Sequence, residues 1–126
     1  MKFLDGFAEQ VYALLRIVGG LLFLAHGVQK FFNFPTNFPM PLSPVLQAAG
    51  AIELVAGGLI LLGLFTRPAA FLASGMAAVG YWMVHGSQGL YPIANGGETI
   101  ALYAFLFLFI AARGAGIWSV DSARSS

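Results

Sequence analysis

Apolar stretches of membrane-spanning length run through almost the whole chain, separated only by short segments rich in proline and glycine. The purest, 17–25, reads Ile-Val-Gly-Gly-Leu-Leu-Phe-Leu-Ala and carries no charge. A helix needs about 20 mostly apolar residues to cross a bilayer, so four crossings use about 80 residues. The remainder of the 126-residue chain suffices only for loops and tails. The sequence therefore predicts an all-α polytopic membrane protein, a bundle of four transmembrane helices forming one domain over 1–126.

Composition supports this fold class and excludes several others. Only 9% of the residues are charged, whereas a soluble domain has about 25%. The net charge of +1 offers no basic surface for nucleic acid. The chain contains no cysteine, which excludes disulfides and thiolate metal ligands, and nothing else in the sequence predicts a metal site. The N-terminal segment lacks a small-residue cleavage site, so we expect the first helix to remain in the mature protein.

Proline and capping signals place the ends of the predicted spans. Prolines in 32–41 cannot continue a helix, and Ser43-Pro44 has the form of an N-cap followed by a first-turn proline. Thr66-Arg67-Pro68 is predicted to be a tight turn. Asn95 and Glu98 are spaced as a capping box, which would start the last helix. The predicted spans are approximately 7–32, 44–65, 68–85 and 95–113.

The distribution of basic residues predicts the orientation of the bundle. Lys2, Arg67, Arg113 and Arg124 fall on the side that holds both termini, and only Lys30 falls on the other. Lysine and arginine concentrate in cytoplasmic loops. We therefore expect a multi-pass protein of the bacterial inner membrane, in contact with the lipid bilayer and with both termini in the cytoplasm.

A weak internal repeat is visible in the chain. His26-Gly27-Val28-Gln29 ends the first span and His85-Gly86-Ser87-Gln88 ends the third, and a helix carrying a glutamate follows each. The first and third spans run in the same direction, so two parallel helical hairpins would be related by an axis along the membrane normal. The two intervening loops differ in length, and the repeat is a hypothesis at this stage.

Glycines occur throughout the first three predicted spans, and we interpret them as packing residues. Small residues let helix backbones approach closely in lipid. A tightly packed bundle accounts for all of them, so none is assigned a function. The glycines concerned are Gly19, Gly20, Gly27, Gly57, Gly58, Gly63, Gly75 and Gly80.

Glu53 is the ionisable residue that the membrane makes most costly. It lies roughly 13 Å along its helix from Pro44, at 1.5 Å per residue, and hence near the bilayer midplane. Intramembrane charges normally face the bundle interior or a cavity and are often functional. Glu53 is therefore the candidate catalytic residue, as a proton donor or acceptor. The alternative is a structural ion pair with Arg16, although Arg16 can equally snorkel to the headgroups.

Further polar residues cluster at the predicted outer ends of the spans. His26 and Lys30 are an i, i+4 pair on one helix face. A histidine there can hydrogen-bond a quinone carbonyl, ligate haem or relay a proton, or it can simply bind a neighbouring backbone carbonyl. We expect Lys30 to snorkel to the interface, and Glu98 is explained equally well by capping. The functional hypothesis is that His26, Glu53, His85 and Glu98 converge on an outward-facing cleft, and the wider set of ligand-binding candidates adds Asn95, Arg16 and Lys30.

The chain resembles the DoxX family of small bacterial membrane proteins over almost its whole length. The matching segments are Leu15-Arg16-Ile17, His26-Gly27, Gln29-Lys30-Phe31, Glu53-Leu54, Asn95-Gly96-Gly97-Glu98 and the ending 114–121. The resemblance implies a four-helix membrane fold and an association with quinone-linked oxidoreductases or the response to oxidative stress. It implies no agreed catalytic residues, and function still has to be argued from the site.

Three functions follow as hypotheses. The first is a membrane subunit of a redox-linked system, such as an oxidoreductase, that binds a quinone in the outward-facing cleft. Haem is a less favoured cofactor. The second is a non-catalytic anchor or assembly subunit for a partner oxidoreductase or stress-response complex. The third is a transporter of protons or small solutes that acts as a homo-oligomer.

Overall fold

The computed structural model describes residues 1–125, with all side chains in that range other than those of Ser87, Asn95 and Ser125. The regular structure of this part is entirely helical. A π-helical turn, Tyr81–His85, continues α4 directly, and a 3-10 turn, Gly86–Gln88, follows it. The helices are α1 (Lys2–Asp5), α2 (Ala8–Phe32), α3 (Pro44–Leu62), α4 (Thr66–Gly80), α5 (Pro92–Asn95), α6 (Glu98–Arg113) and α7 (Val120–Ser125).

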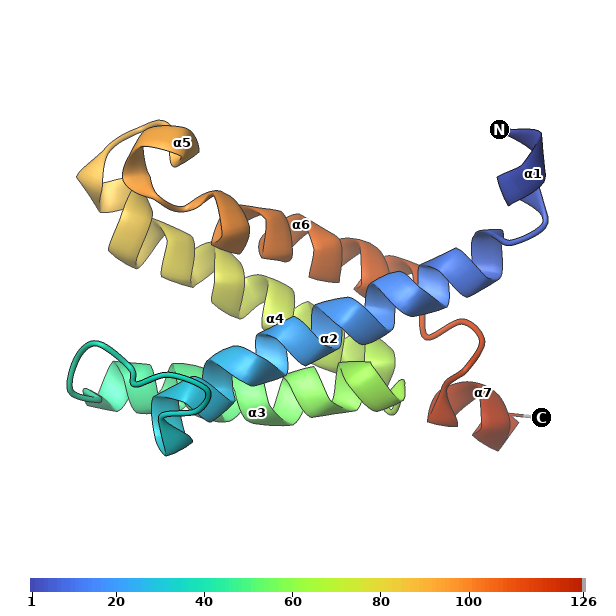
Figure 1. The fold of residues 1–126 in the computed structure, drawn as a ribbon, viewed down its shortest axis with the longest axis horizontal. Coiled ribbons are helices and arrows are strands. Elements are labelled where there is room, and N and C mark those ends of the chain that lie inside the picture. The colour runs from blue at the N-terminus through green and yellow to red at the C-terminus, as the bar shows by residue number, and fades with distance from the viewer. Residues whose placement is uncertain (126) are drawn as a thin grey trace.

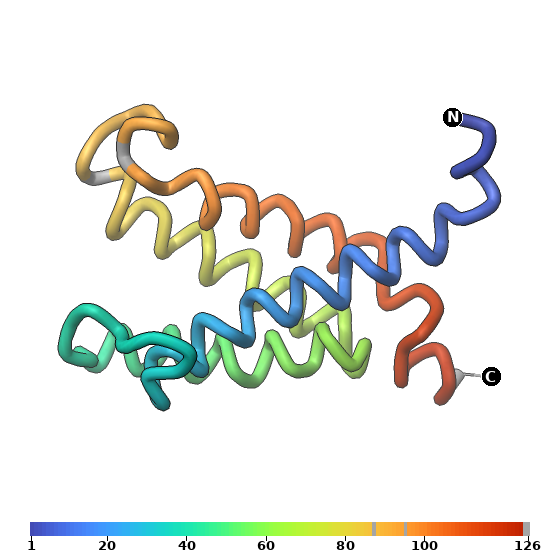
Figure 2. Tube along the Cα trace, viewed as in Figure 1, coloured from blue at the N-terminus to red at the C-terminus, as the bar shows by residue number. Residues whose placement is uncertain are grey.

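The four long helices form two antiparallel hairpins. α2 packs along α3 and α4 packs along α6, and contacts between α3 and α4 join the two pairs. Figure 1 shows that the hairpins diverge toward the end that carries α5 and the α2–α3 loop. Both chain termini lie at the opposite end (Figure 2). The interior between the hairpins is filled by large apolar side chains, among them Phe23, Ile60, Phe107 and Ile110, which are almost completely buried.

A seam of glycines brings α2 and α3 into backbone contact. A Cβ atom on Gly20 would lie 2.6 Å from the amide nitrogen of Leu61, and one on Gly27 would lie 2.8 Å from the carbonyl oxygen of Gly50. Both distances are too short for any side chain, so the predicted packing role is confirmed at these positions. It is wrong for Gly58 and Gly75, which face open space.

The helix ends agree with the sequence where the capping group is local. The Ser43 hydroxyl accepts a hydrogen bond from the amide of Leu46, and Pro44 opens α3, as predicted. The predicted turn at Thr66-Arg67-Pro68 is wrong, because these residues form the first turn of α4. The chain reverses just before them, at Gly63, whose φ of +69° favours glycine.

The surface of the bundle is strongly apolar. Among the described residues, α2 and α3 are the helices long and apolar enough to cross a membrane. α4 and α6 are shorter, but they also expose large side chains, such as Phe71 at 67% and Phe105 at 72%. Soluble monomers rarely expose contiguous patches of this kind, so the outer faces of all four helices suit contact with lipid.

Candidate functional site

A cavity of about 290 Å³ lies within the bundle and is lined by residues from all four long helices. We call it the polar cavity, because four ionisable side chains from the predicted spans, those of His26, Lys30, Glu53 and His85, line it. Its lining residues are Phe23, His26, Lys30, Glu53, Met76, His85, Gly96, Thr99, Ile100 and Tyr103.

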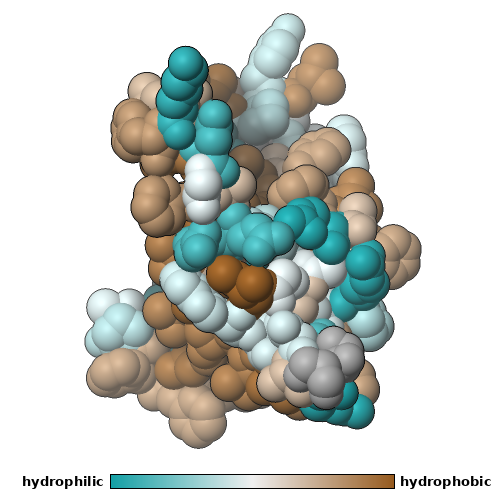
Figure 3. Space-filling model, turned by 90° about the vertical axis from the view of Figure 1, so that its right-hand side faces the viewer, coloured by the Kyte–Doolittle hydropathy of each residue, from teal (hydrophilic) through white to brown (hydrophobic). Residues whose placement is uncertain are grey.

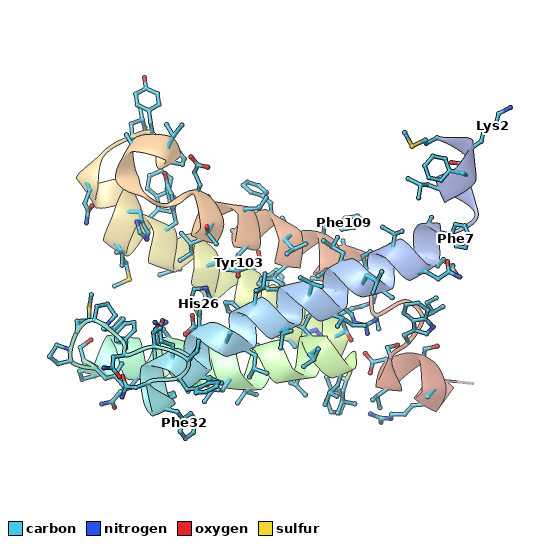
Figure 4. The ribbon with its side chains drawn as sticks, in the orientation of Figure 1. Lys2, Phe7, His26, Phe32, Tyr103 and Phe109 are labelled. Carbon is cyan, nitrogen blue, oxygen red and sulfur yellow. The ribbon has the colours of Figure 1, made fainter. Side chains whose placement is uncertain are left out.

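The two longest walls of the polar cavity come from α2 and α6. His26 and Lys30 are four residues apart on α2, and Thr99 and Tyr103 are four apart on α6, so each pair shares a helix face. The His26 ring meets the Tyr103 ring edge-on, at 6.0 Å between centroids and 87° between planes. Figure 4 shows these two side chains facing one another between the helices. Tyr103 is buried, whereas His26 is exposed to the cavity.

Lys30 and Glu53 form an ion pair across the glycine seam. The Lys30 ammonium nitrogen lies 2.8 Å from Glu53 Oε1, and the two side chains are only 11% and 6% exposed. The prediction that Lys30 snorkels to the interface is therefore wrong. The close approach of the helices at Gly27 puts the carboxylate within reach, and a buried charge is far less costly when it is paired. The Phe38 ring lies beside the ammonium group at 5.3 Å.

Arg16 is completely buried and lies at the other end of the bundle. Its guanidinium donates hydrogen bonds to the backbone carbonyls of Ile60, Ala115, Ile117 and Trp118. Neither predicted role for Arg16 is correct, since it neither snorkels nor pairs with Glu53. Arg16 is 14 residues from Lys30 on α2, or roughly 21 Å at 1.5 Å per residue. It is therefore too far away to serve the polar cavity.

Two further groups close this end of the bundle, Asp121 of the C-terminal segment and Arg67 of α4. Asp121 accepts hydrogen bonds from the amides of Phe65 and Thr66, both at 2.9 Å, and so caps α4. Partial burial alone would raise the pKa of the Asp121 carboxyl, but these hydrogen bonds, with Arg124 nearby, outweigh it and hold the pKa below its usual value. Arg67 in turn donates to the last carbonyls of α6. We call the region around Arg16, Arg67 and Asp121 the closed end.

Glu98 does not join the predicted cleft. It is exposed and lines a surface hollow with Pro92 and Phe105 instead, and its neighbour Thr99 lines both this hollow and the polar cavity. The predicted capping box is also wrong, because α6 begins at Glu98 with Gly97 as its N-cap. The side chain of Asn95, another candidate, lies outside the described part of the chain.

His85 reaches the polar cavity from the π-helical turn that continues α4. The extra residue of a π turn rotates the helix face that follows it, and such turns are frequent at functional sites. The His85 ring also lies 6.4 Å from the Tyr81 ring. His26, Glu53 and His85 therefore line one cavity, together with Lys30, whereas Glu98 and Arg16 do not.

The sequence analysis missed Tyr103 and Thr99. Both residues line the cavity from one face of α6, and the polar spacing of four residues between them is the signal that could have found them. With them, the cavity offers hydroxyl, imidazole and ammonium donors beside one carboxylate. Such a set can hydrogen-bond carbonyl oxygens and can give or accept a proton.

Comparison with known proteins identifies a family and several relatives that the chain resembles. The family model described as DoxX matches residues 11–86. A protein of Haemophilus influenzae is 41% identical, over 97% of this chain and 96% of its own. An uncharacterised membrane protein of Mycobacterium tuberculosis is 30% identical (85% and 77%), and the inner membrane protein YphA of Escherichia coli is 31% identical (96% and 96%). No solved structure matches the chain.

Proposed function

The chain belongs to the DoxX family of membrane proteins, and from this premise we propose that it crosses the inner membrane four times and binds the ring of a quinone in the polar cavity. In this role it serves as a membrane subunit of a redox-linked system. The proposal has two parts, a topology and a ligand, and each has its own test.

The helix lengths support four crossings. α4 and the π-helical turn together run from 66 to 85, which is about 30 Å at 1.5 Å per residue, the thickness of the hydrocarbon core. Hydrophilic side chains gather at the end that holds both termini, which suits an aqueous boundary (Figure 3). The basic residues at this end favour a cytoplasmic position for it. The hairpins α2–α3 and α4–α6 would then be the two parallel repeats.

The absence of native cysteine makes this topology simple to test. Asn37→Cys introduces a thiol in the α2–α3 loop, and Ser122→Cys introduces one in α7. A membrane-impermeant maleimide should label the first variant in intact spheroplasts and the second only after the membrane is permeabilised. The reverse pattern would overturn the orientation, and labelling of both variants in intact spheroplasts would overturn the three crossings proposed between the two positions.

The observation that carries the ligand proposal is the grouping of donors around a buried, paired carboxylate. Ligand pockets are mostly apolar with a few well-placed polar groups, and the polar cavity combines Phe23, Met76 and Ile100 with His26 and Tyr103. The carbonyl oxygens of a quinone accept hydrogen bonds, which an imidazole N–H, a tyrosine hydroxyl and an ammonium group can donate. Glu53 stands where it can exchange a proton with the bound ring.

Quinone binding is tested with the purified full-length protein in nanodiscs of its native lipids. Glu53→Gln and Tyr103→Phe should each weaken binding of a tailless benzoquinone by about tenfold, as expected when one charge-assisted or buried hydrogen bond is lost. Tyr103→Phe removes only a hydroxyl and keeps the ring packing. Glu98→Gln is the matched control, because it makes the same chemical change outside the cavity and should leave binding unchanged. Wild-type affinity in both cavity variants would overturn the proposal.

An anchor or assembly role is the second candidate, and the Lys30–Glu53 pair favours it, because the pair itself ties α2 to α3. Loss of one partner of a buried pair costs about 3–5 kcal/mol. In that case Glu53→Gln should lower thermal stability and partner recovery while Tyr103→Phe changes nothing. A reduced-minus-oxidised spectrum also tests the haem alternative, which would show a Soret shift that disappears in His26→Ala and His85→Ala.

A further inference from the structure

A second hollow, of about 550 Å³, follows the outer face of the bundle between α3 and α4. We call it the α3–α4 groove. Its lining is apolar throughout, and several of the lining residues are small. The lining residues are Val45, Ala48, Ala49, Ile52, Pro68, Phe71, Leu72, Gly75, Met76, Val79, Gly80 and Met83.

The α3–α4 groove and the polar cavity adjoin at two points. Met76 lines both. The second point is at Gly80, which lines the groove, and Ile100, which lines the cavity. A Cβ atom on Gly80 would lie 3.1 Å from the Ile100 side chain. The side chains of Met76 and Ile100 therefore lie at the boundary between the two spaces, and methionine has an unbranched thioether that changes rotamer easily.

We propose that the α3–α4 groove holds the isoprenoid tail of the quinone whose ring occupies the polar cavity, and that this ligand enters from the bilayer between α3 and α4, past Met76. The inference rests on the proposed function and deepens it, since it makes the ligand a lipid-soluble, tailed quinone. A ligand that is dissolved in the membrane then reaches its site without crossing an aqueous phase.

Charge distinguishes this occupant from a phospholipid. The Lys30 ammonium is neutralised by Glu53 at 2.8 Å, so the cavity offers little net positive charge for a phosphate. Every residue that lines the groove is also uncharged. An uncharged ring joined to a single hydrocarbon tail matches a small polar cavity joined to an apolar groove.

Gly75 allows the groove to be filled without disturbing the fold. A Cβ on Gly75 meets nothing within 4 Å, so Gly75→Leu projects into the groove and displaces a tail. Gly58→Leu is the matched control, because Gly58 is equally open on α3 and does not line the groove. Both substitutions also add the same apolar volume and the same helix propensity.

The experiment compares a benzoquinone that carries a long isoprenoid tail with the same ring that carries a hydrogen atom instead. Binding is followed in nanodiscs by quenching of tryptophan fluorescence, since Trp82 precedes Met83 of the groove in the chain. Affinities are expressed as the mole fraction of quinone within the lipid. Stronger partitioning of the tailed compound then does not count as binding.

We expect wild-type protein to bind the tailed quinone about tenfold more tightly than the tailless one, because many small dispersion contacts along the groove add up. Gly75→Leu should abolish this difference while it leaves the affinity for the tailless ring unchanged, and Gly58→Leu should preserve it. Equal affinities for both quinones in wild type would overturn the tail groove while the ring site stands.

Two other outcomes also have a definite meaning. If Gly75→Leu alters only the amount of co-purified phospholipid, an acyl chain occupies the groove and the inference is wrong. If wild-type protein binds neither quinone, the proposed function itself fails and the tail groove fails with it.

Discussion

Arg16→Met should be among the most destabilising single substitutions at the closed end. The guanidinium makes four hydrogen bonds to backbone carbonyls, at 3.1, 2.5, 3.0 and 2.7 Å. The acceptor on α3, the Ile60 carbonyl, keeps its hydrogen bond from the Gly63 amide at 3.1 Å, so it loses one charge-assisted hydrogen bond, worth about 1.5 kcal/mol. The three acceptors in the C-terminal segment are partly buried and regain water in part, which leaves about 0.5 kcal/mol each. We therefore expect a loss of about 3 kcal/mol.

The assay is reversible unfolding of the purified protein in mixed micelles, followed by circular dichroism. Arg16→Lys should lose about half as much stability, because an ammonium group keeps the charge but cannot reach four carbonyls from one planar fork. Arg113→Met is the control for charge, since Arg113 is exposed and its guanidinium lies over the Tyr12 ring at 5.1 Å, a contact worth about 0.5–1 kcal/mol. If the free energy of unfolding of Arg16→Met lies within about 0.5 kcal/mol of the wild-type value, a difference typical of surface substitutions, the hydrogen-bond reasoning is wrong.

Two further predictions concern packing and pH. Gly20→Ala should cost about 1–3 kcal/mol, as overpacking does, because its Cβ meets the α3 backbone, whereas Gly58→Ala should be neutral or stabilising in the same unfolding assay. Asp121 has a lower pKa in the folded state, so its contribution is complete above its unfolded pKa of about 3.9 and is lost as the pH falls through the folded value. The stability difference between wild type and Asp121→Asn, measured by unfolding from pH 7 downward, should therefore shrink in acid, and a constant difference would refute the assignment.

The sequence predicted the helices well because membrane helices are encoded locally. Hydropathy and prolines placed α2 within one residue of the predicted start, and the Ser43 cap needs only the next three residues. The start of α4 was misplaced because its capping carboxylate, Asp121, comes from 55 residues further along the chain. No local pattern at Thr66 reports that contact. The start of α6 was misplaced because the sequence favoured Asn95 as its N-cap, whereas Gly97 holds that position.

The sequence predicted which residues form the candidate site better than it predicted which of them pair with one another. Depth in the membrane singled out His26, Glu53 and His85, and all three line one cavity. The partner of Glu53 was misjudged because two cations, Arg16 and Lys30, share one broad face of α2. The choice between them depends on where along α2 and α3 the backbones come closest, which the glycine seam decides and a helical wheel does not show.

The two buried cations of α2 differ in how much of their bonding capacity the protein itself uses. Arg16 has five N–H donors, and four carbonyls take up the bonds that it makes, so it has little left to offer a ligand. The Lys30 ammonium has three N–H donors, and the described residues provide one ionic partner, Glu53, at the wall of a cavity. Among the described residues, Glu53 Oε1 likewise has the Lys30 ammonium as its one polar partner. A ligand in the cavity can take up the hydrogen bonds that Lys30 leaves unmade. Free hydrogen-bonding capacity therefore distinguishes a ligand-binding cation from a structural one, whereas burial and charge are alike in the two.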